Sequence, residues 1–591
     1  MRAIVAVLLV SAAAPGAERI VAPGLKQSVE ILRDRWGVPH IYAKTADYLF
    51  FAQGYITARD RLFQIDLWRR AGTSKLAEVL GEKALDRDRL ARAVRYRGDW
   101  NREWQAYAPD AKQIVTAFVH GINAYIRGLD GQRPQEFRMA GYDPGLWIPE
   151  DCAARVAGLV MVRNIAREVS RAQDIRRFGL NIVQKNLPPD PDIPIEIPHG
   201  LDLADITPDL LRAYDETIGP FRSAEQGSNN WVVDGSMTVS GKPILANDPH
   251  RPVQIPSLRK TFHLVGPGWN AFGAGEPALP GIAVGHNDRI GFGFTIVGID
   301  QADLYVETLK PEDPNEYLYK GQWRRMETEH EAIAVKGRHE PVAVTLEYTV
   351  HGPVIYKDRA RHRAFALRWV GAEPGGAGYL AALSMARAHN WQEFLKAVER
   401  YKVPSENLVY ADVDGNIGWQ ASGLAPIRRN WSGLLPVPGA SGEYEWSGFR
   451  GLAEQPRLYN PATHFIATAN HNILPPGYRV PLGYEWALPF RFMRIREMLS
   501  TGRKFTVADF ERMQQDVMSL PARRFQAVLR KWTAPPALAG TVREVLAWDA
   551  RLTRDSRAAL VYEEWTEPPS GGYLRRNAGP ARELGTGAGN S

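Results

Sequence analysis

The spacing of apolar residues changes along this chain, and that change constrains the fold more than any other feature. Residues 46–179 repeat apolar side chains every three or four positions, as amphipathic helices do. Residues 228–369 alternate with a period of two between turn sequences, which is typical of β-strands. Residues 186–227 are rich in proline and acid and favour an exposed connecting segment. The sequence therefore predicts an α+β fold, with a mainly helical first part and a strand-rich second part.

Further elements are predicted beyond residue 369. Helical spacing covers Asn390–Lys402, Phe490–Leu499 and Val542–Leu552, while Leu408–Gly423 has the pattern of a β-hairpin. The hairpin's turn, Asp412–Asn416, resembles a calcium loop. It lacks the glutamate that ends such loops, so we interpret it as an Asp-Gly turn.

The N-terminus has the layout of a secretory signal peptide. Arg2 precedes the apolar run Ala3–Ala14, and small residues and a proline follow up to Ala17. The run is too short to cross a bilayer, although a membrane anchor is the alternative interpretation. We therefore predict a signal peptide over residues 1–17 and a periplasmic or secreted protein without a membrane partner.

Charge and cysteine content exclude several classes of function. The net charge is +7, but the basic residues form only short pairs, so no nucleic-acid partner is expected. Cys152 is the only cysteine, which excludes an intramolecular disulfide and a thiolate metal cluster. It lies in a helical pattern and is predicted to be a buried apolar residue. The last 26 residues, 566–591, have little apolar content and are predicted to be disordered.

Several common catalytic motifs are missing. The sequence contains no G-x-S-x-G elbow, no H-E-x-x-H pair and no glycine-rich phosphate loop. An α/β-type serine hydrolase, a zinc enzyme and a nucleotide enzyme are therefore not supported.

Ser228 opens a strand with the unusual run Gly-Ser-Asn-Asn. A serine hydroxyl needs a nearby base to become a nucleophile. If the chain were cut after Gly227, the new α-amino group of Ser228, with an ordinary pKa of about 7.7–8.0, could take that proton. By pattern alone, a glycine-serine pair before a strand is more often a simple turn.

Ordered motifs favour the catalytic interpretation. "QGSNNWVVDGSMTVSGKPILANDPH" resembles the start of the catalytic chain in the penicillin amidase family of N-terminal-nucleophile hydrolases. This family includes penicillin G, cephalosporin and acyl-homoserine-lactone acylases. The resemblance continues through "FAQGYITARDRLFQIDLWRR", "PGIAVGHNDRIGFGFT", "HGPV", "VYADVDGNIGW", "LPVPG" and "FIATANHN", from about Val29 to Trp565.

The resemblance implies a self-cutting precursor with an αββα core, in which two antiparallel sheets lie between helical layers. The cut would fall between Gly227 and Ser228. Residues 18–187 would form a mainly helical α chain, 188–227 an excised spacer and 228–565 the catalytic β chain. The α and β chains of one precursor would then form a heterodimer that hydrolyses a small-molecule N-acyl amide.

The family pattern also assigns roles around Ser228. His250 matches a residue that orients the α-amino group or the substrate amide. The backbone N–H of Ile296 and the side-chain amide of Asn470 match the two oxyanion-hole donors, with Asn472 as the alternative to Asn470. Arg491 matches an arginine that supports the surroundings of the nucleophile.

A structural calcium ion is a further implication of the resemblance, without an organic cofactor. The matching ligands are the carboxylates of Glu168, Asp300 and Asp303 and the carbonyls of Ala302 and Gly433. Hard oxygen ligands of this kind suit Ca²⁺. The family's last aspartate has no clear match, although Glu485 is near in sequence, and a plain surface carboxylate pair is the alternative.

Ungapped counting assigns three positions to the acyl pocket: Val162, Arg251 and Val284. Valines in place of aromatic rings predict a roomy aliphatic pocket that prefers medium or long acyl chains to phenylacetyl. Arg251 would favour an acidic acyl group if it points inward. Strand alternation from His250 predicts that it points outward.

The family's β chains extend beyond the point where the resemblance ends here. The sequence therefore also admits a C-terminally incomplete core and an inactive, truncated homologue. An uncut secreted protein that binds a ligand without turnover is the alternative from a different functional class.

Overall fold

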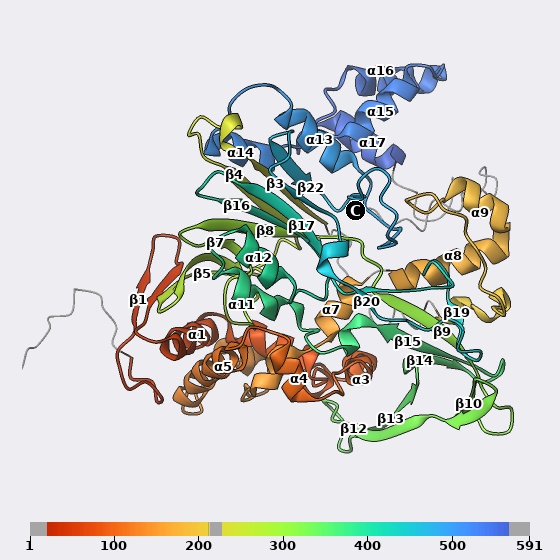
Figure 1. The fold of residues 1–591 in the computed structure, drawn as a ribbon, viewed down its shortest axis with the longest axis horizontal. Helices are drawn as coiled ribbons and strands as arrows, with labels where there is room; N and C mark the ends of the chain where they lie inside the picture. The colour runs from red at the N-terminus through yellow and green to blue at the C-terminus, as the bar shows by residue number, and fades with distance from the viewer. Residues whose placement is uncertain (1–19, 163, 211, 213–226, 567–591) are drawn as a thin grey trace, which may run out of the picture.

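The computed structural model describes residues 20–162, 164–210, 212 and 227–566. The predicted signal peptide and residues 567–591 of the predicted disordered tail lie outside the described residues. So do residues 213–226 of the predicted connecting segment. The described part contains both helices and sheets (Figure 1), which confirms the α+β prediction.

Two long helices dominate the first part, α1 (Ala46–Gly72) and α5 (Ala111–Gly128). They cross closely because glycines face the contact: a Cβ on Gly54 would come within 2.0 Å of a backbone oxygen of α5. A Cβ on Gly121 would come within 1.9 Å of a backbone oxygen of α1. The other helices of this part are α2 (Ala77–Leu80), α3 (Leu85–Ala93), α4 (Trp100–Gln105), α6 (Gln135–Ala140), α7 (Val156–Met161), α8 (Asn164–Phe178) and α9 (Leu180–Asn186).

A nine-stranded sheet lies against these helices. Its order is β1-β2-β5-β6-β7-β8-β16-β17-β21, so strands from both parts of the sequence join in one sheet. The strands are β1 (Glu30–Arg33), β2 (Pro39–Tyr42), β5 (Lys260–Gly266), β6 (Trp269–Gly275), β7 (Val284–His286), β8 (Ile290–Ile296), β16 (Glu406–Asp412), β17 (Ile417–Ser422) and β21 (Arg457–Tyr459).

A three-stranded sheet carries Ser228. Its order is β22-β3-β4, with β3 (Gly227–Val233) between β22 (Phe465–Thr468) and β4 (Ile244–His250). Both pairings are antiparallel, and the register places Gly227 opposite His250. The residues that directly follow β22 therefore emerge beside the start of β3.

Helices and two sheets form a central stack (Figure 1). Three layers of apolar side chains hold this stack together. The first lies between the nine-stranded sheet and α1, α5, α11 (Ala382–Met385) and α12 (Trp391–Val398). Successive side chains of a strand point to opposite faces. Val232 therefore packs between the two sheets, while Trp231 packs against α13 (Phe490–Leu499) and α14 (Val507–Gln514). The stack thus has the layer order helix, sheet, sheet, helix.

A six-stranded sheet extends to one side of this stack, with α8 packed on β9. Its order is β12-β13-β14-β15-β9-β19, and β19 pairs with β9 in parallel. The strands are β9 (Ala302–Thr308), β12 (Glu327–Ile333), β13 (Val342–Thr349), β14 (Gly352–Asp358), β15 (Arg363–Trp369) and β19 (Val437–Pro438). Two strand pairs and three helices complete the described part: β10 (Glu316–Tyr319) with β11 (Gln322–Arg325), β18 (Ala425–Pro426) with β20 (Phe449–Arg450), and α15 (Leu520–Leu529), α16 (Ala539–Ala547) and α17 (Arg557–Thr566).

Most of the later predicted elements are confirmed, but the helix predicted at 542–552 is α16, which ends at Ala547. The helix predicted at 390–402 is α12, the helix at 490–499 is α13, and the hairpin at 408–423 is β16–β17. The turn of that hairpin is closed by Asp412, whose carboxylate accepts hydrogen bonds from Asn416. Cys152 is buried, as predicted.

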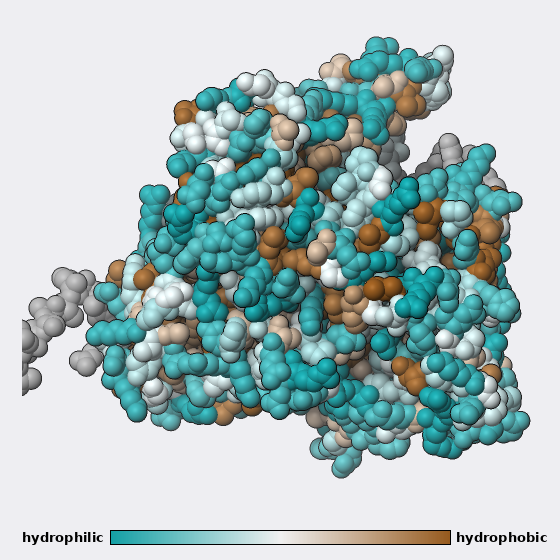
Figure 2. Space-filling model, in the orientation of Figure 1, coloured by the Kyte–Doolittle hydropathy of each residue, from teal (hydrophilic) through white to brown (hydrophobic). Residues whose placement is uncertain are grey.

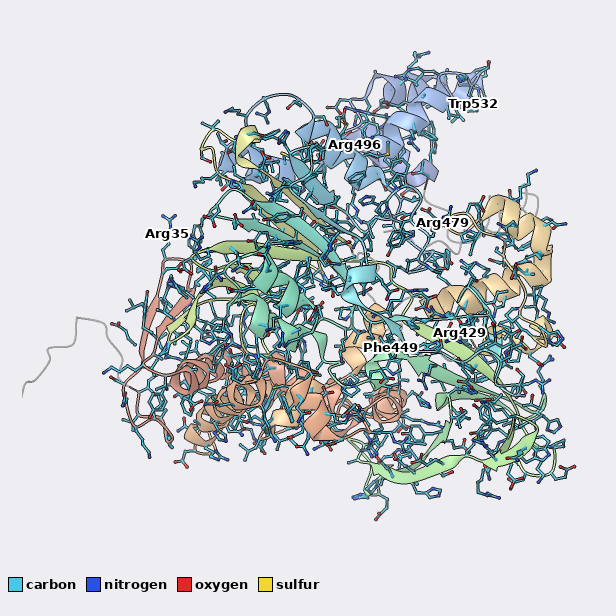
Figure 3. All side chains as sticks on the ribbon, in the orientation of Figure 1. Arg35, Arg429, Phe449, Arg479, Arg496 and Trp532 are labelled. Atoms are coloured by element: carbon cyan, nitrogen blue, oxygen red, sulfur yellow. The ribbon has the colours of Figure 1, made fainter. Side chains whose placement is uncertain are left out.

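The visible surface is largely hydrophilic, with hydrophobic residues in small separate groups (Figure 2). The labelled arginines Arg35, Arg429, Arg479 and Arg496 lie apart from one another and do not form a stripe (Figure 3). Among the described residues, no helix combines the length and the apolar content needed to cross a membrane.

Candidate active site

Ser228 lies near the beginning of β3, and only 7% of its surface is exposed. Its hydroxyl donates to the carbonyl oxygen of Gly227 at 2.6 Å. Its backbone N–H donates to Oδ1 of Asn470 at 2.7 Å. The hydroxyl thus lies next to the peptide bond that the sequence marks for cutting.

Asn470 follows β22 and connects Ser228 to the end of β8. Its Oδ1 accepts from Ser228 and from Nη2 of Arg491 at 3.0 Å, while its Nδ2 donates to the carbonyl of Ile296 at 2.7 Å. Two donors on one side and a carbonyl on the other fix the orientation of the amide. Its backbone is left-handed, with φ of 61°, a conformation that costs energy for any residue but glycine and is common at functional sites. In the uncut chain both ends of this amide are occupied.

Ile296 ends β8 and has its backbone N–H free of the neighbouring strand. Val297 N donates to Ser405 O at 3.0 Å, which makes that pair the hydrogen-bonded one of the antiparallel ladder. In such a ladder the preceding residue directs its N–H and C=O to the opposite side. The Ile296 carbonyl does so, because it meets Asn470 there. We therefore place the Ile296 N–H on the Ser228 side of β8.

Arg491, in the first turn of α13, holds the start of β3 in place. Its Nη1 donates to Ser228 O and to Asn229 Oδ1, both at 2.7 Å. Asn229 in turn contacts Nε2 of His250 at 3.2 Å, and Asp248 lies 3.4 Å from the same nitrogen. Burial lowers the pKa of Arg491 to about 10. The predicted residues Ser228, His250, Asn470 and Arg491 are thus brought together.

Gly227 is confined by the same groups. A Cβ at this position would lie 3.1 Å from Nδ1 of His250 and 3.2 Å from Nη2 of Arg491. Both distances are tighter than ordinary van der Waals contact. A side chain at this position would therefore press on both groups, whereas glycine leaves them in place.

Asn472, the alternative to Asn470, lies elsewhere. Its Nδ2 donates to Asp190 Oδ1 at 2.6 Å, and it is not among the residues that line the cavity at Ser228. The choice of Asn470 as the residue that contacts Ser228 therefore agrees with the structure.

A cavity of about 1020 Å³ opens at Ser228. Val162 and Arg251 both line it, so the prediction that Arg251 points outward is wrong. The physical reason is that β4 ends at His250, and strand alternation does not extend to the next residue. Arg251 donates no hydrogen bond to any residue that the structure describes.

Val284 does not reach this cavity. It belongs to β7 and packs against the apolar layer between the nine-stranded sheet and the helices. That layer lies on the far side of the nine-stranded sheet from the three-stranded sheet that carries Ser228. The assignment of Val284 to the acyl pocket is wrong. Ungapped counting matched a sequence position of the family but could not give the direction of its side chain.

A buried polar group close to this cavity was missed by sequence reasoning. Glu406 lies directly opposite Ile296 in the β8–β16 pairing and is fully buried. Tyr379 donates to its Oε1 at 3.2 Å, while Oε2 has no hydrogen-bond partner in the described part of the chain. Burial raises the pKa of Glu406 to about 8, against the opposing charges of Arg251 and Arg259. The one sequence signal was its place shortly before the apolar run Leu408–Ala411 of β16.

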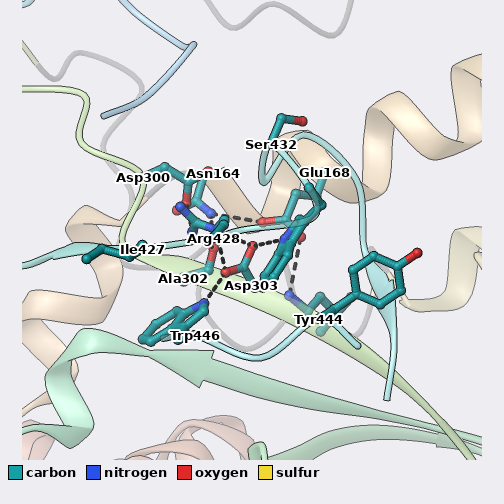
Figure 4. A network of polar contacts seen from close by, with 12 residues as sticks. Asn164, Glu168, Asp300, Ala302, Asp303, Ile427, Arg428, Ser432, Tyr444 and Trp446 are labelled. Carbon is teal, nitrogen blue, oxygen red and sulfur yellow. Dashed lines mark hydrogen bonds and ion pairs between the residues drawn. The ribbon is translucent and has the colours of Figure 1, made fainter. Parts of the chain in front are cut away.

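A second polar cluster joins α8 to the start of β9 (Figure 4). Ligand atoms of Glu168, Asp300 and Asp303 lie within 4.8 Å of one another, and all three residues are buried. Burial raises the pKa of Asp300 to about 8 and that of Glu168 well above its ordinary value. The structure therefore brings together the three carboxylates that the sequence assigned to calcium.

Arg428 reaches into this cluster. Its Nε donates to Asp303 Oδ2 at 2.8 Å and its Nη2 to Asp300 Oδ1 at 2.7 Å (Figure 4). Asn164 donates to Ala302 O at 2.5 Å and to Glu168 Oε1 at 2.9 Å. Arg428 was not expected, because an arginine in "PIRRN" has no sequence feature that distinguishes it from a surface residue.

Of the other two residues considered as calcium ligands, Gly433 lies next to the cluster and Glu485 binds an arginine instead. Gly433 is adjacent, because a Cβ on it would lie 2.5 Å from Asp300 Oδ2. Glu485 instead accepts from Arg171 at 2.5 Å. The donor set fits a hard divalent cation in chemistry and in charge, since three carboxylates face a single guanidinium.

Comparisons with known proteins agree with this geometry. A family model described as penicillin amidase matches residues 28–581. The acyl-homoserine lactone acylase QuiP of Pseudomonas aeruginosa is 29% identical over 579 residues, covering 91% of this chain and 68% of the relative. The penicillin acylase 2 proenzyme of Pseudomonas sp. strain SE83 is 31% identical over 563 residues, covering 91% of this chain and 71% of the relative.

A solved structure shows the same similarity. The thermostable penicillin G acylase from Alcaligenes faecalis matches with a TM-score of 0.50 and 27% sequence identity. The match covers 55% of this chain and 59% of that chain. Because the family model matches nearly the whole of this chain, the chain belongs to the penicillin amidase family and is a hydrolase of amide carbon–nitrogen bonds.

Proposed function

We propose that this protein is an exported, self-processing amidohydrolase that cleaves N-acyl amides through an acyl-enzyme on an N-terminal Ser228. The observation that carries the proposal is the position of Asn470, which contacts both Ser228 N and Ile296 O. This position supports a site in which the nucleophile, its future α-amino group and two oxyanion donors surround one cavity. The helix-sheet-sheet-helix stack supports an αββα N-terminal-nucleophile core.

The first reaction is the cut after Gly227. Ser228 Oγ attacks the Gly227 carbonyl carbon, the C–N bond breaks, and the leaving nitrogen takes a proton. This step produces an ester between Gly227 and Ser228 and frees the α-amino group. Water then hydrolyses the ester, leaving a carboxylate on Gly227 and a free hydroxyl on Ser228. The hydrogen bond of 2.6 Å between Oγ and Gly227 O already brings the reacting groups together.

In turnover, the α-amino group of Ser228 acts as the base for its own hydroxyl. Its nitrogen remains beside Asn470 Oδ1, which holds it in a defined direction. Arg491 is a buried cation that contacts Ser228 O at 2.7 Å. A nearby positive charge disfavours protonation of an amine, so Arg491 keeps the α-amino group neutral near pH 7. His250 contacts Asn229 and orients this group or the substrate amide rather than accepting the proton.

The tetrahedral intermediate would be stabilised by Asn470 Nδ2 and the Ile296 N–H. The carbonyl of Ile296 occupies Nδ2 in the uncut chain. Nδ2 carries two hydrogens, and this bond uses one of them, so the second is available for the oxyanion. A hydrogen bond to the charged oxyanion is stronger than one to a neutral acceptor.

We propose Ca²⁺ as a structural ion held by Glu168, Asp300 and Asp303 together with the carbonyls of Ala302 and Gly433. Bound there, calcium would neutralise negative charge that Arg428 leaves uncompensated. It takes no part in the chemistry at Ser228. Because Glu168 precedes the cut and the two aspartates follow it, this cluster would join the α and β chains as a heterodimer.

The cavity supports N-acyl amides with a medium or long aliphatic acyl group as preferred substrates. Acyl-homoserine lactones belong to this class. Its volume of about 1020 Å³ reaches the upper end of the range for small-molecule sites. The names of the relatives, an acyl-homoserine lactone acylase and a penicillin acylase, are compatible with this substrate class. Arg251 favours a second candidate, an acyl group that ends in a carboxylate, because it lines the cavity without a hydrogen-bond partner among the described residues.

Rates of hydrolysis for a series of acyl chains test these substrates. We expect kcat/KM to rise with aliphatic chain length, by up to about 0.8 kcal/mol for each buried CH₂. A preference for phenylacetyl would contradict the aliphatic pocket. A preference for glutaryl that disappears in Arg251→Ala would select the carboxylate candidate. A protein that stays uncut and binds acyl amides without turnover would support the non-catalytic alternative.

A further inference from the structure

Residues 188–210, here called the arm, are exposed at many positions, as their proline and acid content predicts, but buried apolar residues anchor them. Ile195, Ile206 and Leu210 are at most 3% exposed. They belong to the apolar cluster that includes strands β9 and β15 of the six-stranded sheet. The arm thus buries its apolar residues against strands that follow Ser228 in sequence.

Polar contacts fasten the same arm. Arg363 of β15 donates to Asp205 Oδ2 at 2.6 Å, and both side chains are largely buried. Tyr444 donates to the carbonyl of His199 at 3.2 Å. Both partners lie downstream of the cut proposed at Ser228, so these contacts would join the two chains after cutting.

Asp190 connects the arm to the wall of the catalytic cavity. Its backbone N–H donates to Tyr484 O at 3.1 Å, and its carbonyl accepts from Trp486 Nε1 at 2.8 Å. Its Oδ1 accepts from Asn472 Nδ2 at 2.6 Å. Tyr484 and Trp486 both line the cavity at Ser228. Three hydrogen bonds from one residue therefore hold this wall.

We propose that the arm stays in the upstream chain after processing and that Asp190 is a positioning residue for the cavity wall. Proteolytic trimming concentrates where backbone is exposed and poorly packed. Exposed positions such as Glu196, Ile197 and Gly200 lie between the buried anchors at Ile195 and Asp205, so cleavage within the arm first requires these buried contacts to open. Any segment removed before Ser228 therefore begins after Leu210, which is later than the boundary at residue 188 predicted from composition. This inference rests on the proposed self-processing.

Intact masses of the separated chains test the retention of the arm. We expect a downstream chain that begins at Ser228 and an upstream chain that ends at or after Leu210. An upstream chain that ends within or before residues 188–210 would overturn the inference while leaving the proposed function intact. The absence of any chain that begins at Ser228 would instead contradict the proposed function.

Limited proteolysis tests the packing of the arm whether or not the chain cuts itself. Protease should cleave the native protein outside residues 188–210 first, and the arm only when the whole protein unfolds. Cleavage within the arm at the rate seen for urea-unfolded protein would overturn the inference. Ile206→Asp, which places a charge in the buried cluster, should make the arm sensitive.

Asp190→Ala tests the positioning role. We expect KM to rise about two- to tenfold, the factor that one ordinary hydrogen bond corresponds to, with kcat changed less. Asp190→Asn keeps the acceptor for Asn472 and should restore KM. Asp192→Ala is the matched control, because Asp192 is exposed and, among the described residues, its side chain bonds only to Gln184. Equal KM values for Asp190→Ala and the control would contradict the role of Asp190.

Discussion

The nucleophile network and the carboxylate cluster are built in opposite ways. In the first, Ser228, Asn470 and Arg491 are linked by neutral amides and one buried cation, and no carboxylate of the described residues hydrogen-bonds to Ser228. In the second, three buried carboxylates surround a single guanidinium, that of Arg428. The first favours a neutral amine, whereas the second favours a bound cation.

The two regions also differ in where their residues lie along the sequence. The network around Ser228 draws all of these residues from 228 onward: Ser228 lies in β3, Asn470 follows β22, and Arg491 lies in α13. The cluster takes Asn164 and Glu168 from α8 and the rest from segments after Ser228. Under the proposed processing, chemistry belongs to one chain and the cluster joins the two chains. Disruption of the first region should abolish turnover, whereas disruption of the second should weaken the assembly.

Ser228→Ala should have the largest effect. Without Oγ the chain should stay uncut, and amidase activity should fall by about 10⁶-fold, as loss of a nucleophilic serine does elsewhere. Denaturing gels and amide hydrolysis measure both outcomes. Ser236→Ala, a change at an exposed hydroxyl in the same segment, is the control. Normal two-chain processing of Ser228→Ala would show that the nucleophile is misassigned.

Asn470→Ala should lower kcat by about 10²–10³-fold, the usual cost of one oxyanion donor. KM should change less, because the donor acts mainly on the charged intermediate. Asn472→Ala is the control for kcat, since that residue bonds to Asp190 of the arm and not to Ser228, and its loss should change KM only. Steady-state kinetics of both processed variants decide the matter. Equal kcat values would remove Asn470 from the oxyanion site.

His471 tests the electropositive character of the nucleophile region. Burial, helped by Arg491, lowers its pKa from 6.5 to about 4. A folded-state pKa below the unfolded one means that stability is full above pH 6.5 and is lost as the pH falls toward 4. The difference corresponds to about 3 kcal/mol of unfolding free energy. His471→Gln should remove this part of the unfolding free energy that is lost at acidic pH, whereas a change at the exposed His339 should not.

Calcium should stabilise the carboxylate cluster and leave the chemistry unchanged. At about a hundred times its Kd, the ion should raise the free energy of unfolding by about 2.7 kcal/mol. Asp303→Asn should abolish this rise, whereas Asp414→Asn, at an exposed ion pair with Arg289, should not. Thermal unfolding with calcium and with chelator measures the difference. Identical curves for the native protein would argue against a calcium site.

Arg251→Ala should have the smallest effect, a change in acyl preference of about tenfold. Removing the guanidinium should lower kcat/KM for acyl groups that end in a carboxylate and raise it for plain aliphatic ones. Arg251→Lys keeps the charge and is the matched control. Unchanged preferences across both series would show that Arg251 does not contact the acyl group.

Sequence reasoning succeeded where a pattern carries its own geometry. The change of period predicted the helical and strand-rich parts, and ordered motifs pointed to Ser228, Asn470 and Arg491. It failed where direction or burial depends on the whole fold. Val284 faces the helical layer, and Arg251 follows the end of β4, so neither direction can be counted along a strand.

Buried polar residues were the hardest to predict. Arg428 and Glu406 look like surface residues in sequence, because only tertiary packing encloses them. The arm was predicted only in part: many of its residues are exposed, as its prolines and acids indicated, but a few irregularly spaced apolar residues are buried and anchor it. Composition describes the tendency of an isolated segment, but not how other parts of the fold pack against it.

N-terminal sequencing of the purified protein tests the central claim most directly. If Ser228 is a self-generated N-terminal nucleophile, one of two co-purifying chains begins Ser-Asn-Asn-Trp, and the same chain is absent from Ser228→Ala. A protein that hydrolyses amides at full rate while its Gly227–Ser228 bond remains intact would contradict the account.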